Sequence, residues 1–120
     1  MARTLTFTGE VNWPIEDGKQ AAKVALSASL VYSSAFLIEK VYAAPITDEA
    51  VVLPMTSAKF LLLQATGTED VSVKLNGNAN AIPIKATSGF ILVNNPDGAI
   101  TALTVTVATA PATLRGIAFA

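Results

Sequence analysis

The sequence predicts an all-β protein, an antiparallel β-sandwich of jelly-roll type with eight to ten short strands. Apolar and polar residues alternate with a period of two along most of the chain, which is typical of strands with one buried face. Clusters of Gly, Pro, Asn, Asp and Ser interrupt the alternation at short intervals, as turns between strands do. Because neither a linker nor a fixed-period repeat is found, residues 1–120 are expected to form one domain.

The N-terminal part of the chain contains two long candidate strands. In the first, the apolar residues of one face are Leu5, Phe7, Val11 and Trp13, and turn residues follow at 14–18. The second candidate strand, residues 20–32, is rich in Ala, so a helix remains an alternative for this segment. Its alternation and its Ser and β-branched residues favour a strand. Residues 36–42 are expected to continue in extended form.

The middle of the chain shows shorter strands. We expect a loop over residues 43–49 and a short strand over 51–53. Residues 60–65 contain three consecutive leucines, which predicts a strand buried on both sides. Asn76-Gly77, after the alternating stretch 71–75, is typical of a hairpin turn because both residues tolerate positive φ.

Three further strands follow. Pro83 lacks the N–H that a sheet ladder needs, so its strand is expected at an edge. Residues 90–93 lead into a turn at 94–98. The clearest strand is 100–107, with its inward and outward residues alternating: Leu103, Val105 and Val107 inward, and Ala102, Thr104 and Thr106 outward. Residues 114–119 form the last one.

The composition excludes several function classes. Hydrophobic residues make up 52% of the chain and charged residues 14%, against about 25% charged in an average domain. The net charge is −1 and Lys and Arg do not cluster, so nucleic-acid binding is not expected. No polybasic helix or apolar run of about 18 residues indicates a membrane contact. The high hydrophobic content and low charge instead predict a surface that contacts other proteins, including other copies of the chain in a dimer or trimer.

The residue types needed for common enzyme chemistry are missing. The chain contains no His and no Cys, which removes the usual general base, the thiol nucleophile and the usual zinc ligands. The acidic pairs at 16–17, 48–49 and 69–70 lie beside turns, and neighbours on a strand point to opposite faces, which argues against paired catalytic carboxylates. We therefore expect no enzyme activity, cofactor or metal.

A calcium site is the best alternative among metal sites. Its candidate oxygen ligands are Asn76, Asn78, Asn80, Asn94, Asn95 and Asp97. Calcium takes six to eight oxygens, usually with several carboxylates. Only one of these residues is acidic, so ordinary turn propensity explains the loops better.

The terminal segments provide the candidate contact with other subunits. Terminal strands often lie at sheet edges and carry unpaired backbone groups. The apolar candidates are Leu5, Phe7 and Trp13 with Ile117 and Phe119. Alternatively these side chains fill the core, and the contact is made by Thr-rich faces that include Thr104 and Thr106. An exposed Trp13 would also suit a carbohydrate-binding module, as a platform for stacking on a sugar ring.

The stretch from Lys59 to Phe119 resembles small virion proteins of tailed bacteriophages, in particular capsid cement (decoration) proteins. The segments that show the resemblance are Phe60-Leu61-Leu62-Leu63-Gln64-Ala65-Thr66-Gly67, Val71-Ser72-Val73-Lys74-Leu75-Asn76-Gly77, Gly89-Phe90-Ile91-Leu92-Val93 and Ala99-Ile100-Thr101-Ala102-Leu103-Thr104-Val105. The resemblance implies a short β-sandwich that binds the major capsid protein on the capsid exterior as a dimer or trimer. Tail, fibre-base and baseplate β-domains resemble this stretch in the same way. The position of the protein in the virion therefore stays open between the capsid and the tail.

The N-terminal segment bears on where such a protein is made. Residues 1–7 lack the apolar stretch of a signal peptide. We therefore expect synthesis in the host cytoplasm, followed by assembly into the virion.

Overall fold

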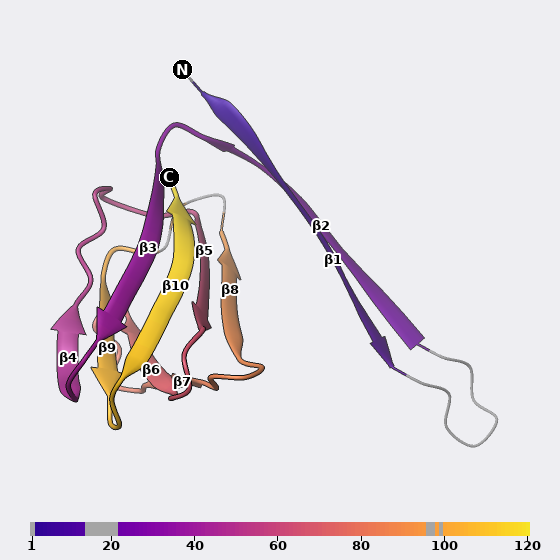
Figure 1. The fold of residues 1–120 in the computed structure, drawn as a ribbon. Helices are drawn as coiled ribbons and strands as arrows, with labels where there is room; N and C mark the ends of the chain where they lie inside the picture. The colour runs from indigo at the N-terminus through magenta and orange to yellow at the C-terminus, as the bar shows by residue number, and fades with distance from the viewer. Residues whose placement is uncertain (1, 14–21, 96–97, 99) are drawn as a thin grey trace. The chain divides into compact units, whose positions relative to one another are not determined.

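The computed structural model describes residues 2–13, 22–95, 98 and 100–120. The chain divides into two compact units, Met1–Ser33 and Ser34–Ala120. The described residues form ten strands in antiparallel sheets and no helix, which confirms the predicted all-β fold (Figure 1). Consequently no described helix is long and apolar enough to cross a membrane. The sequence predicts a single domain over residues 1–120, and the division into two compact units does not test that prediction.

The first unit is a two-stranded antiparallel ribbon. Strand β1 (Arg3–Trp13) pairs with β2 (Ala22–Tyr32) along its whole length, so that Arg3 lies opposite Tyr32 and Trp13 opposite Ala22. The choice of strand over helix for residues 20–32 is therefore confirmed from Ala22 onward. The turn predicted at 14–18 lies outside the described residues. Figure 1 shows the ribbon as a long, twisted hairpin.

The second unit is a sandwich of two four-stranded sheets. The first sheet has the order β3 (Ala35–Tyr42), β10 (Ala112–Phe119), β5 (Phe60–Ala65) and β8 (Phe90–Asn94). The second sheet has the order β4 (Ile46–Ala50), β9 (Leu103–Val107), β6 (Val71–Leu75) and β7 (Ile82–Ile84). Figure 1 shows β3, β10, β5 and β8 side by side in this order.

Alternate residues of both sheets fill the space between them. The fully buried side chains with the largest volumes are Ile38, Leu61, Leu63, Ile84, Ile100, Leu103, Leu114, Val71, Val73, Val105 and Val107. The strand predicted at 100–107 is β9, which begins only at Leu103, and its predicted orientation is confirmed because Leu103, Val105 and Val107 are buried while Thr104 and Thr106 are only half-buried. The prediction that residues 60–65 are buried on both sides is wrong for Leu62. On the outer face of β5, Leu62 is half-buried and Gln64 is exposed, and Phe60 alone is buried.

The expected loop at 43–49 is confirmed for residues 43–45 and wrong for residues 46–49, and the strand expected at 51–53 is wrong. Strand β4 occupies Ile46–Ala50, and the residues after it are not a strand. The pairing of β4 with β9 shifts register between Ile46 and Glu49, and Asp48 has a positive φ of 48°. This irregularity disturbs the alternation that would mark a strand in the sequence.

Two predicted turn and edge features are confirmed. Asn76 and Gly77, between β6 and β7, have φ values of 56° and 70°, as the hairpin signal predicted. The Oδ1 atom of Asn76 also accepts a hydrogen bond from the backbone N–H of Thr101 at 2.8 Å. Pro83 lies in β7, the edge strand of the second sheet.

Candidate protein-interaction surfaces

The outer face of the first sheet is lined by large apolar side chains. The antiparallel register places four aliphatic residues in one row across the four strands: Leu37, Ile117, Leu62 and Leu92. Leu37 is 54% exposed and the other three are half-buried. On the same face Val41 is 74% exposed and Phe90 is 62% exposed. We call this surface the apolar sheet face.

An aromatic pair lies at one end of the apolar sheet face. Phe60 and Phe119 are opposite each other in register, and their ring centroids are 5.8 Å apart in an edge-to-face arrangement. Both rings are buried. The structure thus brings two predicted contact residues, Ile117 and Phe119, together on this face.

The apolar sheet face also carries one pair of opposite charges. The guanidinium Nε atom of Arg115 lies 3.6 Å from the carboxylate Oε1 atom of Glu39, on the neighbouring strand. Both side chains are 60% exposed. Glu39 and Arg115 are the charged outward residues of these four strands, so the face has no net charge.

The outer face of the second sheet is polar. Lys74 Nζ lies 3.0 Å from the Asp48 carboxylate, and Thr106 Oγ1 accepts a hydrogen bond from the backbone N–H of Asp48 at 3.0 Å. Thr104 lies opposite Lys74 in register. We call this surface the polar sheet face. The predicted contact residues Thr104 and Thr106 therefore lie on the opposite side of the sandwich from Ile117 and Phe119.

The ribbon also has one apolar and one polar face. Residues directly opposite each other share a face, and the apolar pairs are Leu5 with Leu30, Phe7 with Ala28, Gly9 with Leu26 and Val11 with Val24. Val11, Val24 and Leu26 are 52%, 48% and 44% exposed. The other face carries Thr4, Thr6, Thr8, Ser27 and Ser29 together with Glu10, Ala25 and the 59% exposed Val31. We call the first of these the apolar ribbon face.

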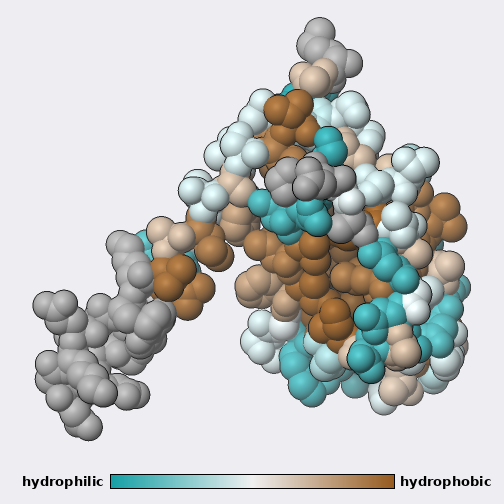
Figure 2. All heavy atoms as spheres, turned by 180° about the vertical axis from the view of Figure 1, so that it is seen from behind, coloured by the Kyte–Doolittle hydropathy of each residue, from teal (hydrophilic) through white to brown (hydrophobic). Residues whose placement is uncertain are grey.

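The remaining predicted contact residues belong to this ribbon. Leu5 and Phe7 are half-buried, and the side chain of Trp13 lies outside the described side chains. The structure therefore distributes the predicted contact residues over two compact units. Figure 2 shows hydrophobic residues gathered in one field on the sandwich and recurring along the ribbon.

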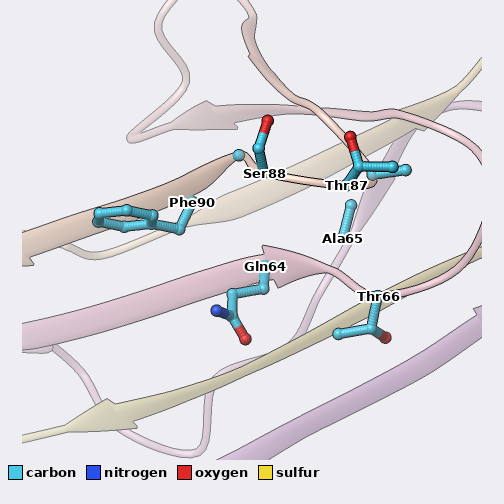
Figure 3. Close-up of a pocket in the computed structure, with 8 residues that line it drawn as sticks. Gln64, Ala65, Thr66, Thr87, Ser88 and Phe90 are labelled. Atoms are coloured by element: carbon cyan, nitrogen blue, oxygen red, sulfur yellow. The ribbon is translucent and has the colours of Figure 1, made fainter.

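A shallow hollow of about 300 Å³ lies beside the end of β5 and the start of β8. Its lining includes the ring of Phe90, the amide of Gln64 and the hydroxyls of Thr66, Thr87 and Ser88. Figure 3 shows the Gln64 amide pointing away from the Thr87 and Ser88 hydroxyls. The eight lining residues include no titratable side chain, and their polar groups do not converge on one point.

Asp70 of an acidic pair and Asn78 of an Asn-rich loop each have structural partners. Lys85 donates a hydrogen bond to Asp70 at 2.8 Å, and the backbone N–H of Ala86 donates another at 3.0 Å. The Lys85 bond and then the Ala86 bond lower the pKa of the Asp70 carboxyl from its usual value. Asn78 Oδ1 accepts a hydrogen bond from the backbone N–H of Asn80 at 2.9 Å. Within the described residues, no group of three or more His, Asp or Glu residues could hold a metal ion, while the pair at 16–17 and Asp97 lie outside them.

Comparisons with protein-family models, with curated proteins and with solved structures found no match to this chain. The surfaces described above are therefore the basis for a functional proposal.

The sequence prediction missed the apolar row on the first sheet. A signal for it was present, because residues 60–63 are apolar at every position and residues 36–38 are Phe-Leu-Ile. Apolar residues at consecutive strand positions put large side chains on both faces of the strand. On a two-sheet sandwich, one of these faces lies outside the core.

Proposed function

We propose that this chain is a structural virion subunit that decorates and cements the capsid of a tailed phage through protein-protein contacts. The observation that carries the proposal is the ribbon, a separate unit with one continuous apolar face. A two-stranded ribbon alone is at best marginally stable in water. A ribbon with this pattern is suited to lie on another protein, its apolar face down and its Thr and Ser residues toward solvent.

The partner we propose for the apolar ribbon face is the lattice of major capsid protein. Burying a Val or Leu side chain fully contributes about 1.5–3 kcal/mol, and Val11, Val24 and Leu26 each have roughly half of their surface to bury. One ribbon therefore supplies a few kcal/mol at most, before the cost of association. A contact of this size is weak alone and effective when it is repeated over a lattice with two or more ribbons engaged together.

The connectivity of the sandwich also supports a virion protein. The antiparallel pairs β3–β10, β4–β9, β5–β8 and β6–β7 are nested within one another along the chain. A long hairpin that rolls up into two sheets gives this order, which is why we propose a jelly roll. Jelly rolls form viral capsid domains and also lectin domains, so the fold is compatible with the proposal without deciding it.

The test uses a matched pair of substitutions on β2. Leu26→Glu places a charge on the apolar ribbon face, and Ser27→Glu places the same charge on the opposite face. Capsids grown without this chain are mixed with each purified variant and sedimented. We expect wild-type protein and Ser27→Glu to co-sediment in lattice-wide copy number and Leu26→Glu to remain in the supernatant.

Several outcomes contradict the proposal. Binding of Leu26→Glu at wild-type level would show that the apolar ribbon face does not make the contact. Absence of wild-type binding to capsids would remove the decoration function, and binding in a few copies to isolated tails would move the protein to a tail position. Circular dichroism of each variant checks that the fold is intact.

A further inference from the structure

We infer that the apolar sheet face is a self-association surface on which a second copy of this chain packs face to face about a two-fold axis. The inference rests on the proposed function in one respect, namely that a dimer would offer two ribbons to a lattice. The argument itself uses the sandwich unit alone.

The apolar sheet face exposes more hydrophobic surface than a single soluble sheet usually does. Leu37, Val41 and Phe90 are each more than half exposed, and the row from Leu37 to Leu92 connects all four strands. Large contiguous apolar patches on a soluble domain usually mark contact surfaces. The polar sheet face shows that the same domain can carry a hydrophilic outer surface, so the apolar one is not a consequence of the fold.

The size of the face is suited to a modest, specific interface. Strands lie about 4.8 Å apart and rise about 3.4 Å per residue, so strands of this length give a flat footprint on the order of 400 Å² per copy. Side-chain relief adds to the accessible area. Standard interfaces bury about 800 Å² per partner, so a face-to-face pair is smaller than that class and fits a weak, reversible dimer. Two sheets can pack in this way at about 10 Å separation, as the two layers of a sandwich do.

The charges on the face identify a second copy as the occupant. Glu39 and Arg115 lie side by side and are largely exposed, and they give the face one negative and one positive site. In a two-fold interface, residue i of one copy meets residue j of the other and the reverse. Arg115 of each copy can then lie against Glu39 of the other copy, so a surface of this kind is complementary to itself.

The experiment is a charge-reversal mixing test in solution. Glu39→Arg gives a face with two cations, and Arg115→Glu gives a face with two anions. Each variant alone should repel its own copies, and we expect dimerisation to weaken by about ten-fold or more because like charges then face each other. An equimolar mixture restores opposite charges across the interface and should form mixed dimers with affinity close to wild type.

Sedimentation velocity measures the association, and native mass spectrometry with one variant isotopically labelled identifies the mixed dimer. Lys74→Glu is the matched control, because it reverses the cation of the exposed ion pair on the polar sheet face. This control should dimerise like wild type. Circular dichroism checks that all variants are folded.

A wild-type protein that is monomeric at about 100 μM, or that forms trimers, would overturn the inference. Single reversals that dimerise like wild type, or a mixture that stays monomeric, would do the same. Capsids are absent from this experiment, so its outcome does not depend on whether the ribbon binds a lattice. The Leu26→Glu and Ser27→Glu comparison tests that contact separately.

Discussion

The two outer faces of the sandwich differ sharply although they cover the same core. The apolar sheet face presents a row of aliphatic side chains with one charge pair, Glu39 and Arg115. The polar sheet face presents hydroxyls and the pair formed by Lys74 and Asp48. A domain that stayed monomeric would gain solubility from two faces of the second kind. The unusually neutral composition of the chain is therefore concentrated on particular surfaces.

The ribbon repeats this contrast on a smaller scale. Its strands alternate apolar residues on one face with Thr and Ser on the other. In both units much of the exposed hydrophobic surface is therefore gathered on one face, while Val31 and Val52 lie outside these faces. A hydrophobic surface that is gathered on one face favours specific contacts over non-specific association, because one partner surface can cover that face completely.

The largest expected effect comes from the core that supports both faces. Leu114 is completely buried in β10, beneath the apolar sheet face. Leu114→Ala leaves a cavity and should lower the free energy of unfolding by about 2–5 kcal/mol. Urea unfolding measures this loss. Leu37→Ala, on the outer face of the neighbouring strand β3, is the control and should cost much less; equal losses would contradict the assignment of inner and outer faces.

A smaller effect on stability, with a clear effect on association, is expected from two exposed valines. Val41 on the apolar sheet face is 74% exposed, and Val52 after β4 is 79% exposed. Val41→Lys and Val52→Lys should each change the free energy of unfolding by no more than about 0.5 kcal/mol, since surface substitutions usually do. Sedimentation velocity should show weaker self-association for Val41→Lys alone. If both variants associate equally, the contrast between the faces has no bearing on assembly.

The smallest effect is expected at an exposed ion pair next to the second sheet. Asp70 precedes β6 and binds Lys85, and this hydrogen bond is the main cause that lowers the pKa of the Asp70 carboxyl. Because the pKa is lower in the folded state, the pair stabilises the fold above the ordinary value near 3.8, and the stabilisation is lost as pH falls through the folded-state pKa. Asp70→Asn should therefore be slightly less stable than wild type at pH 7, and the gap should close in acid.

Urea midpoints of the two proteins from pH 7 down to pH 2 measure this gap. Both side chains are well exposed, so the gap is expected to be small and to shrink further in high salt. A gap that persists unchanged at pH 2 would mean that the charge of the Asp70 carboxylate does not explain what this residue contributes to stability.

Much of the fold could be predicted from local sequence signals. Alternation located the strand that contains Leu103, and the Asn76-Gly77 signal located its hairpin, because both effects act within a few residues. Strand β4 was not recognisable, since its register shift and the left-handed Asp48 disturb the alternation. The pairing of β10 between β3 and β5 joins segments far apart in the chain, and no local signal reports it.

The candidate surfaces could be predicted only in part. Ile117 and Phe119 were identified as contact candidates, and both lie on the apolar sheet face. The row that Ile117 shares with Leu37, Leu62 and Leu92 depends on register across four strands, and a single strand does not contain that information. Likewise, Thr104 and Thr106 were predicted as an alternative contact to the apolar candidates, and the sequence does not say that their strand joins the other sheet.

The nested pairing of the sandwich strands has a consequence for how the protein folds. The hairpin β6–β7, closed at Asn76-Gly77, joins neighbouring segments and needs little chain entropy to form. The outer pairs are much more distant in sequence: Asp48 and Thr106, which hydrogen-bond between β4 and β9, are 58 residues apart. Each inner pair that forms shortens the loop that the next pair must close. Folding that starts at the central hairpin and proceeds outward therefore meets the lowest entropic cost, and the strands next to the ribbon and the C-terminus, β3 and β10, are the last to pair.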